Sequence, residues 1–286
     1  MMSRSRVSCG VWGVATALVV VGCSADPTPR FNPPVPDGGG FVPFDVGPGQ
    51  TCRGNRDGVI AREELLFVLG AEGRYRVNPP ATLARLSTRG TMHNDGTRTW
   101  DFRDPAGELL TLRLEPAAGQ WFASRFPGAQ YVSRLDIRTP LLGVYRATDT
   151  SVELLGAAGP TAASETVIPY AMPLDVLRFP LRLGDTWVAT SQTMDATVDG
   201  LPAVSRDRYE ITVDARGEVR TEAITFSDVL RVRVELTQTF PAGPGIRRIQ
   251  YLWMAECYGE VARAVSRDGD VDPDFTEATE FRRIGL

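Results

Sequence analysis

Apolar and polar residues alternate with a period of two along several stretches of this chain. The clearest stretch is 230–236, where Leu230, Val232, Val234 and Leu236 alternate with Arg231, Arg233 and Glu235. The stretch 209–214 repeats the pattern, with apolar residues at every second position. Because successive side chains of a strand point to opposite faces, this period predicts strands with one buried and one solvated face.

Shorter runs of the same kind fill the chain from residue 73 onward. Turn-forming sequences such as Asp104-Pro105-Ala106-Gly107 separate them. We predict strands at 73–77, 97–103, 110–114, 121–126, 131–137, 141–146 and 152–155, and a loop-rich crossing at 160–180. Short strands at this spacing predict an all-β domain with one or two short helices, built as a curved antiparallel sheet or open half-barrel meander.

The N-terminus has the organisation of a secretory signal. Arg4 and Arg6 precede an apolar run from Val11 to Val21. This run is too short to cross a bilayer, since a spanning helix needs roughly 20 apolar residues. A charged start, a short apolar run and small residues are typical of a cleaved signal. We therefore predict a signal peptide at 1–22; the alternative is an ordinary cleavage near Ala25.

The run ends in Val20-Val21-Gly22-Cys23, which resembles the lipobox of bacterial lipoproteins. The resemblance implies that Cys23 is acylated and becomes the new N-terminus, with the membrane as partner. Three acyl chains hold a protein stably, at about 0.8 kcal/mol per buried CH₂. Ser24 stands where an aspartate implies retention in the inner membrane. We therefore expect a lipid anchor in the outer membrane of the cell envelope.

Residues 24–51 form a spacer in which proline and glycine dominate. No period of 2 or 3.6 is present, and such a segment buries too little apolar surface to offset its ordering entropy. We predict a lipidated cysteine followed by a flexible tether at 23–51. One antiparallel β domain at 52–286 follows it.

Composition narrows the function classes. The 286-residue chain carries a net charge of −4 and 43% hydrophobic residues, and all of its cationic side chains are arginines. A hydrophobic content of this size is enough for a packed core. The negative balance and the lack of a basic tract argue against nucleic acid as a partner.

Four cysteines are present, and two of them remain for the folded domain. Cys9 leaves with the signal and Cys23 carries the lipid, so Cys52 and Cys257 form an even pair in an exported chain. Such a pair predicts a disulfide. The alternative is two buried free thiols. The pair is not in a metal-binding or redox spacing, which argues against zinc.

Residues 53–64 resemble part of a calcium-binding EF-hand loop. Asn55, Asp57 and Glu64 stand in register as ligands around the turn residue Gly58, and a helix is expected to follow Glu64. However, Arg53 occupies the first ligand position, where a carboxylate is required. Calcium needs at least about six oxygen ligands, so we favour a turn and a short capped helix over a metal site.

Catalytic chemistry finds little support in the sequence. His93, the single histidine, lies in a polar stretch that reads as a hairpin turn, with no evident partner for general base catalysis. No nucleophile elbow or phosphate-binding glycine loop occurs. Asp268, Asp270, Asp272 and Asp274 form the densest acidic cluster, which we interpret as a solvated hairpin tip because Pro273 replaces the glycine of a calcium loop. We therefore predict no enzymatic activity and no cofactor.

Two stretches of the second half resemble a pattern in exported bacterial lipoproteins of unknown function. The first is 179–187, FPLRLGDTW, and the second is 251–263, which begins YLWMA. The resemblance covers roughly 178–266 and implies a curved antiparallel sheet similar to the open half-barrels of periplasmic lipoprotein carriers. It carries no catalytic residues. Trp187 and Trp253 within it bring large apolar area to the core.

Two hypotheses for function follow. The first is a membrane-anchored, non-enzymatic lipoprotein whose β domain is an interaction or envelope-structural module, with an envelope protein as partner. The second is a half-barrel that binds or carries a lipid or another hydrophobic ligand. A carrier requires an open apolar concavity of several hundred Å³, whereas an interaction module has its apolar side chains packed solid. A hydrolase built on paired carboxylates has the least support.

Overall fold

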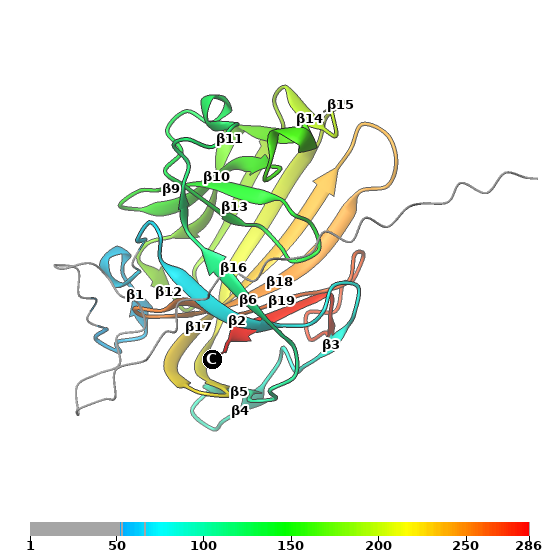
Figure 1. Cartoon of the computed structure of the whole chain (residues 1–286). Helices are drawn as coiled ribbons and strands as arrows, with labels where there is room; N and C mark the ends of the chain where they lie inside the picture. Colours follow the sequence, from blue (N-terminus) through cyan, green and yellow to red (C-terminus); the bar gives the residue numbers. More distant parts are fainter. Residues whose placement is uncertain (1–51, 53, 66, 286) are drawn as a thin grey trace, which may run out of the picture. The chain divides into compact units, whose positions relative to one another are not determined.

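Two large antiparallel sheets make up the domain in the computed structural model (Figure 1). The structure describes residue 52 and residues 54–65 and 67–285, all of which belong to one compact unit. None of the sheets closes into a barrel in this part of the chain. The prediction of an all-β fold with a curved antiparallel sheet is therefore confirmed.

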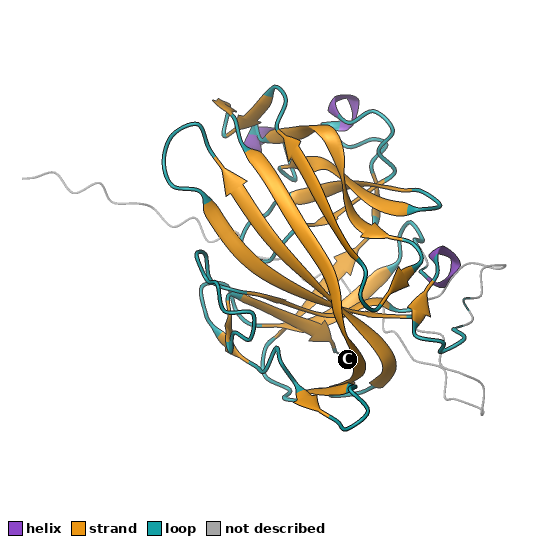
Figure 2. Cartoon of the chain, turned by 180° about the vertical axis from the view of Figure 1, so that it is seen from behind, coloured by secondary structure: helices purple, strands orange, loops and turns teal. Residues whose placement is uncertain are grey.

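The larger sheet has ten strands and contains the long alternating stretches of the sequence. Its centre is a meander of four consecutive strands, β16 to β19, which twist across the domain in Figure 2. One parallel pairing, between β5 and β16, interrupts the antiparallel pattern. Its strands in spatial order are β4 (Thr91–Met92), β5 (Arg98–Phe102), β16 (Arg206–Thr221), β17 (Thr225–Thr239), β18 (Ile246–Ala255), β19 (Gly259–Val265), β21 (Glu280–Ile284), β2 (Glu72–Val77) and β6 (Glu108–Arg113), with β13 (Thr186–Gln192) also paired to β16.

The smaller sheet has seven strands and lies along one face of the larger one (Figure 1). Two short two-stranded sheets complete the fold: β1 (Val59–Ile60) with β12 (Leu181–Arg182), and β3 (Ala84–Arg85) with β20 (Glu277–Ala278). The seven strands in spatial order are β15 (Leu201–Ala203), β14 (Ala196–Val198), β11 (Val167–Arg178), β10 (Ser151–Ala158), β9 (Leu142–Ala147), β8 (Tyr131–Arg134) and β7 (Glu115–Pro116).

Both faces of the larger sheet carry a hydrophobic core, which strand alternation explains. On β18, Tyr251 and Trp253 point to the face covered by the β3–β20 pair, whereas Leu252 and Met254 point toward the smaller sheet. Trp253 is fully buried and packs edge-on against Phe102. The predicted structural role of Trp253 is confirmed, but the expected wet face is only partly present because further chain segments cover it.

Helical structure is limited to three single turns of 3₁₀ helix within the described residues: η1 (Arg62–Glu64), η2 (Ala123–Arg125) and η3 (Ala162–Ser164). The predicted strand at 121–126 is wrong. Residues 123–125 form the 3₁₀ turn η2, in which the N–H of Arg125 donates to the backbone oxygen of Phe122 at 2.9 Å and that of Phe126 to Ala123 at 3.1 Å, and Phe122 and Phe126 are both buried. The helix expected after Glu64 is also absent, because η1 ends at Leu65 in extended backbone.

The stretch 160–180 is mostly strand and not the loop that its prolines predict. Strand β11 spans Val167–Arg178 and includes Pro169 and Pro173. Its pairing with β10 shifts register between Leu154 and Gly156, which face this part of β11. Proline is tolerated in a sheet at such irregularities because its missing N–H interrupts the ladder least there.

No helix in the described part of the chain has the length and apolarity needed to cross a membrane. The signal peptide at 1–22, the acylated Cys23 and the tether at 23–51 lie outside the described residues.

Candidate functional site

A cavity of about 330 Å³ lies between the two large sheets. Its walls come from β16, β17, β18, β19, β21, β2 and β6 of the larger sheet and from β8 to β11 of the smaller one. The volume is at the lower end of the range of roughly 300–1,000 Å³ that small-molecule sites occupy.

Most of the cavity wall is apolar. Ile211 and Val234 are buried on the larger sheet, and Leu177 faces them from the smaller sheet. Leu252 and Met254 on β18 extend the same wall. These residues belong to the alternating set that the sequence assigns to a buried face, but the two sheets stand too far apart here for the side chains to fill the space.

A buried charged group forms another part of the wall. The carboxylate of Glu260 accepts hydrogen bonds from Arg282 at 2.7 Å and from Arg263 at 2.5 and 3.0 Å. Arg282 also lies 3.4 Å from the fully buried Glu280. Burial alone would raise the pKa of Glu260, but the charges of and hydrogen bonds from Arg263 and Arg282 outweigh it and lower this pKa. Glu260 is therefore held as an anion between two cations.

The connection from β8 to β9 covers the charged part of the cavity wall. The backbone oxygen of Leu135 accepts a hydrogen bond from Arg263 at 3.2 Å, and the N–H of Ile137 donates to Glu280 at 3.0 Å. Asp136 caps the same connection by accepting from the N–H groups of Arg138 and Thr139. These bonds join the smaller sheet to β19 and β21, so the charged wall is fixed from both sides.

Three polar side chains that line the cavity lack either a carboxylate partner or a hydrogen-bond partner among the described residues. Arg134 donates to the backbone oxygens of Asp136 and Ile137 at 2.9 and 3.1 Å, and it pairs with no carboxylate among the described residues. Tyr131 and Tyr145 stack at 5.3 Å, and neither hydroxyl has a hydrogen-bond partner in the described chain. Burial raises the pKa of both tyrosines, so their hydroxyls stay protonated at neutral pH.

An N-terminal strap, which we define as residues 54–65 and 67–71, closes one end of the cavity. Leu65 is buried against the cavity wall, and Phe67 stacks on Tyr131 at 5.8 Å. The strap is tied down on both sides: Arg62 donates to the backbone oxygen of Thr148 at 3.0 Å, and Gly70 donates to Leu114 at 2.7 Å.

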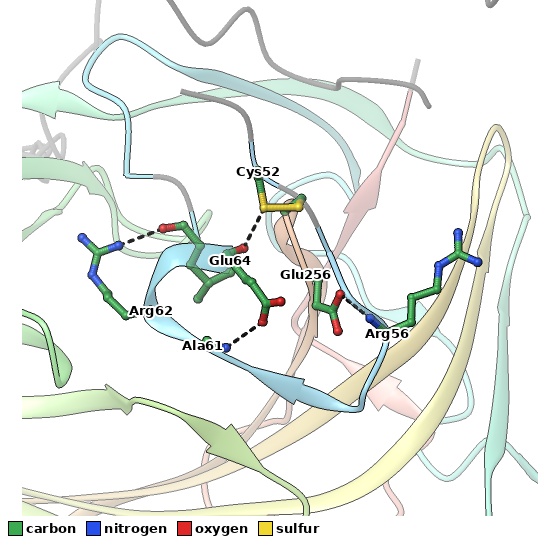
Figure 3. Close-up of a disulfide and its surroundings, with 8 residues drawn as sticks. Cys52, Arg56, Ala61, Arg62, Glu64 and Glu256 are labelled. Atoms are coloured by element: carbon green, nitrogen blue, oxygen red, sulfur yellow. Dashed lines mark hydrogen bonds between the residues drawn. A yellow bond between two sulfur atoms is a disulfide. The ribbon is translucent and has the colours of Figure 1, made fainter. Parts of the chain in front are cut away.

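The disulfide between Cys52 and Cys257 holds the start of this strap (Figure 3). The two Cα atoms lie 5.4 Å apart, within the ordinary range for such bridges. The N–H of Cys257 also donates to the backbone oxygen of Glu64 at 2.7 Å. The predicted disulfide is confirmed, and the structure adds that Cys257 lines the cavity.

The residues of the EF-hand-like loop do not converge on one point. Asn55 and Asp57 bond to each other and shape the turn, in which the Asp57 side chain accepts from the N–H of Val59 at 2.8 Å. The Glu64 carboxylate turns away and accepts from the N–H of Ala61 at 2.9 Å, as Figure 3 shows. Within the described residues no group of three or more histidine, cysteine, aspartate or glutamate residues is arranged to hold a metal ion.

The other sequence candidates lie apart from the cavity. His93 is exposed in the β4–β5 hairpin turn, as expected, and its ring contacts Thr99 at 2.8 Å. Asp270 is half-buried and Asp272 exposed, and each accepts a hydrogen bond from the backbone N–H two residues later. This acidic cluster is therefore a solvated loop, and its first member, Asp268, pairs with Arg248 at 2.6 Å.

Sequence reasoning missed the cavity itself and its charged residues. One signal was present on β18, where Arg248 and Gln250 share a face with Leu252 and Met254. Polar residues in register with a buried face indicate a polar site within a core. The glutamate and arginine of the second lipoprotein-like stretch, Glu260 and Arg263, gave a further signal, but only the fold brings Arg282 and Arg134 beside them.

Comparisons with known proteins return no match: no protein family, no curated protein and no solved structure is similar to this chain.

Proposed function

We propose that this protein is a non-enzymatic binder of a hydrophobic ligand, which it holds between its two sheets. The single observation that carries the proposal is the cavity of about 330 Å³ with its mostly apolar wall. Binding sites for small molecules are typically apolar concavities with a few placed polar groups.

The cavity favours this function over an interaction or envelope-structural module. For such a module we expected the tryptophan, leucine and valine side chains to fill the space between the layers. Trp253 and Trp187 do pack into cores. Between Leu177, Val234 and Leu252, however, open volume remains. Empty apolar volume lowers stability, so a cavity of this size suggests that a ligand contributes the missing contacts.

A binder of this kind fits the anchor that the sequence predicts. We propose that Cys23 is acylated, that 24–51 tether the domain, and that the protein resides at the outer membrane, where apolar ligands are concentrated. Labelling of growing cells with a radioactive fatty acid tests the anchor. We expect label on the wild-type protein and none on Cys23→Ser; label that persists on Cys23→Ser contradicts the lipidation.

Titration with the neutral apolar fluorophore N-phenyl-1-naphthylamine tests binding in the cavity. The full-length chain with Cys23→Ser serves as the reference protein, because it has no acyl chain of its own to compete. We expect saturable binding with one site per chain. Leu252→Trp places a large ring in the cavity and is expected to abolish this binding while the domain stays folded.

The matched control is Leu201→Trp, which adds the same ring at a side chain that is 71% exposed on β15. It is expected to bind the fluorophore like the reference protein. Should Leu252→Trp unfold, Ala71→Leu reduces the volume from the strap at the end of the cavity. Absence of saturable binding in the reference protein, or unchanged binding in a folded Leu252→Trp, overturns the proposed function.

A further inference from the structure

We propose that the ligand is a single-chain amphiphile with one carboxylate, and that Arg134 binds this carboxylate. The inference rests on the proposed function, because it concerns the same cavity. It adds the charge and the orientation of the ligand, which follow from the charged residues of the wall. It also adds the number of acyl chains in the ligand, which follows from the size of the cavity.

Among the described residues, the charges around the cavity leave one cation without a carboxylate partner. Six arginines line the wall, and five carboxylates pair with five of them. The six arginines are Arg113, Arg134, Arg138, Arg248, Arg263 and Arg282, and the five carboxylates are Glu72, Asp136, Asp268, Glu260 and Glu280. The arginine that remains is Arg134, whose hydrogen-bond partners in the described part of the chain are two backbone oxygens. A partly buried cation attracts one anion, so the ligand carries one negative charge.

The position of Arg134 sets the orientation of the ligand. Arg134 is the last residue of strand β8. Tyr131, its first residue, and Ser133 also line the cavity. Ser133 and Tyr131 make no side-chain hydrogen bond in the described chain, so each supplies a hydroxyl donor in the same cavity. A carboxylate accepts several such hydrogen bonds at once. The apolar chain then extends toward Ile211 and Val234.

The size of the cavity limits the ligand to one acyl chain. A volume of about 330 Å³ is at the lower end of the range for small-molecule sites. The strap also covers one end through Leu65 and Phe67. A single acyl chain matches this space better than a lipid with two chains. A phosphate monoester carries more than one negative charge at neutral pH, which exceeds the one unpaired cation.

Displacement of the bound fluorophore by matched twelve-carbon probes tests the inference. The probes are laurate, dodecanol and dodecyl phosphate, all used below the concentrations at which they form micelles, with the Cys23→Ser protein. We expect laurate to displace the fluorophore at about tenfold lower concentration than dodecanol, since a hydrogen bond to a charged group contributes at least that much. Laurate is also expected to displace it better than dodecyl phosphate.

Three variants separate a role in ligand binding from a role in folding. Arg134→Gln is expected to remove the preference for laurate over dodecanol and to leave fluorophore binding intact. Arg134→Lys retains the charge and most of the preference. Arg85→Gln, at an exposed arginine on β3 away from the cavity, is the matched control and keeps the full preference.

The outcomes distinguish the two proposals. If the fluorophore does not bind, the proposed function fails and the carboxylate inference fails with it. If the fluorophore binds but laurate and dodecanol displace it equally, or if the preference survives in Arg134→Gln, only the inference is overturned. Stronger displacement by dodecyl phosphate than by laurate also overturns the choice of a carboxylate.

Discussion

Glu260 is the residue on which the charged wall of the cavity depends. It accepts hydrogen bonds from Arg263 and Arg282, and only 14% of its side chain is exposed. Because two cations share one carboxylate, the loss of that carboxylate leaves the buried Arg282 and the largely buried Arg263 with fewer partners. Loss of one partner from a buried ion pair destabilises a protein much more than loss of an exposed pair.

We predict that Glu260→Gln lowers the free energy of unfolding by about 3 kcal/mol, as expected when a buried charge loses its partner. Equilibrium unfolding in urea measures this change. Glu72→Gln is the matched control, because Glu72 pairs with Arg113 at the exposed rim; its cost is expected to stay below about 1 kcal/mol. Equal effects of the two substitutions contradict the role assigned to Glu260.

The lowered pKa of Glu260 also predicts how stability depends on pH. The folded pKa lies below the ordinary value of 4.5, so the stabilisation is fully present above that value and is lost as the pH falls through the folded pKa. The arginines remain charged throughout this range. The difference in unfolding free energy between wild type and Glu260→Gln should therefore be constant near neutral pH and shrink in acid. A difference that grows in acid has the wrong sign for this account.

At the scale of elements, the N-terminal strap connects the predicted tether to the cavity. The described residues of the strap have little regular secondary structure, namely β1 and η1. Its position depends on the disulfide, on the β1–β12 pairing and on Arg62. The described segment that lies nearest to the predicted anchor in sequence therefore forms part of the cavity wall.

We predict that Cys52→Ser with Cys257→Ser lowers the free energy of unfolding by up to about 5 kcal/mol. The bridge spans 205 residues, and the chain-entropy model gives this upper value for a loop of that length. Urea unfolding with and without a reductant provides the measurement. Reductant should destabilise the wild type and leave the double variant unchanged. A wild type that is insensitive to reduction of its disulfide contradicts the prediction.

The alternating pattern predicted most strands, because period-two alternation is a local property. The stretches 209–213 and 230–236 lie within β16 and β17, and those at 73–77 and 110–114 match β2 and β6 closely. The failures have tertiary causes. The aromatic run at 121–126 turns so that it can cover the outer face of the smaller sheet, and β11 tolerates prolines at a shift of register.

At the scale of the whole molecule, the arrangement of the sheets was the part that the sequence did not predict. Alternation indicates which side chains face inward, but it does not say whether two facing layers meet or leave a space. Residues as distant in the chain as Arg134, Glu260 and Arg282 come together only because β8, β19 and β21 border one cavity. The disulfide was predictable because the prediction needed only the cysteine count and the signal peptide that the sequence predicts.

Binding in the cavity is the central claim, and native mass spectrometry of the Cys23→Ser protein incubated with laurate tests it most directly. We predict one laurate per chain on the protein with an intact cavity, one on the surface control Leu201→Trp, and none on Leu252→Trp. A protein that retains no laurate, or equal retention by Leu252→Trp, contradicts the claim that the space between the sheets is a ligand site.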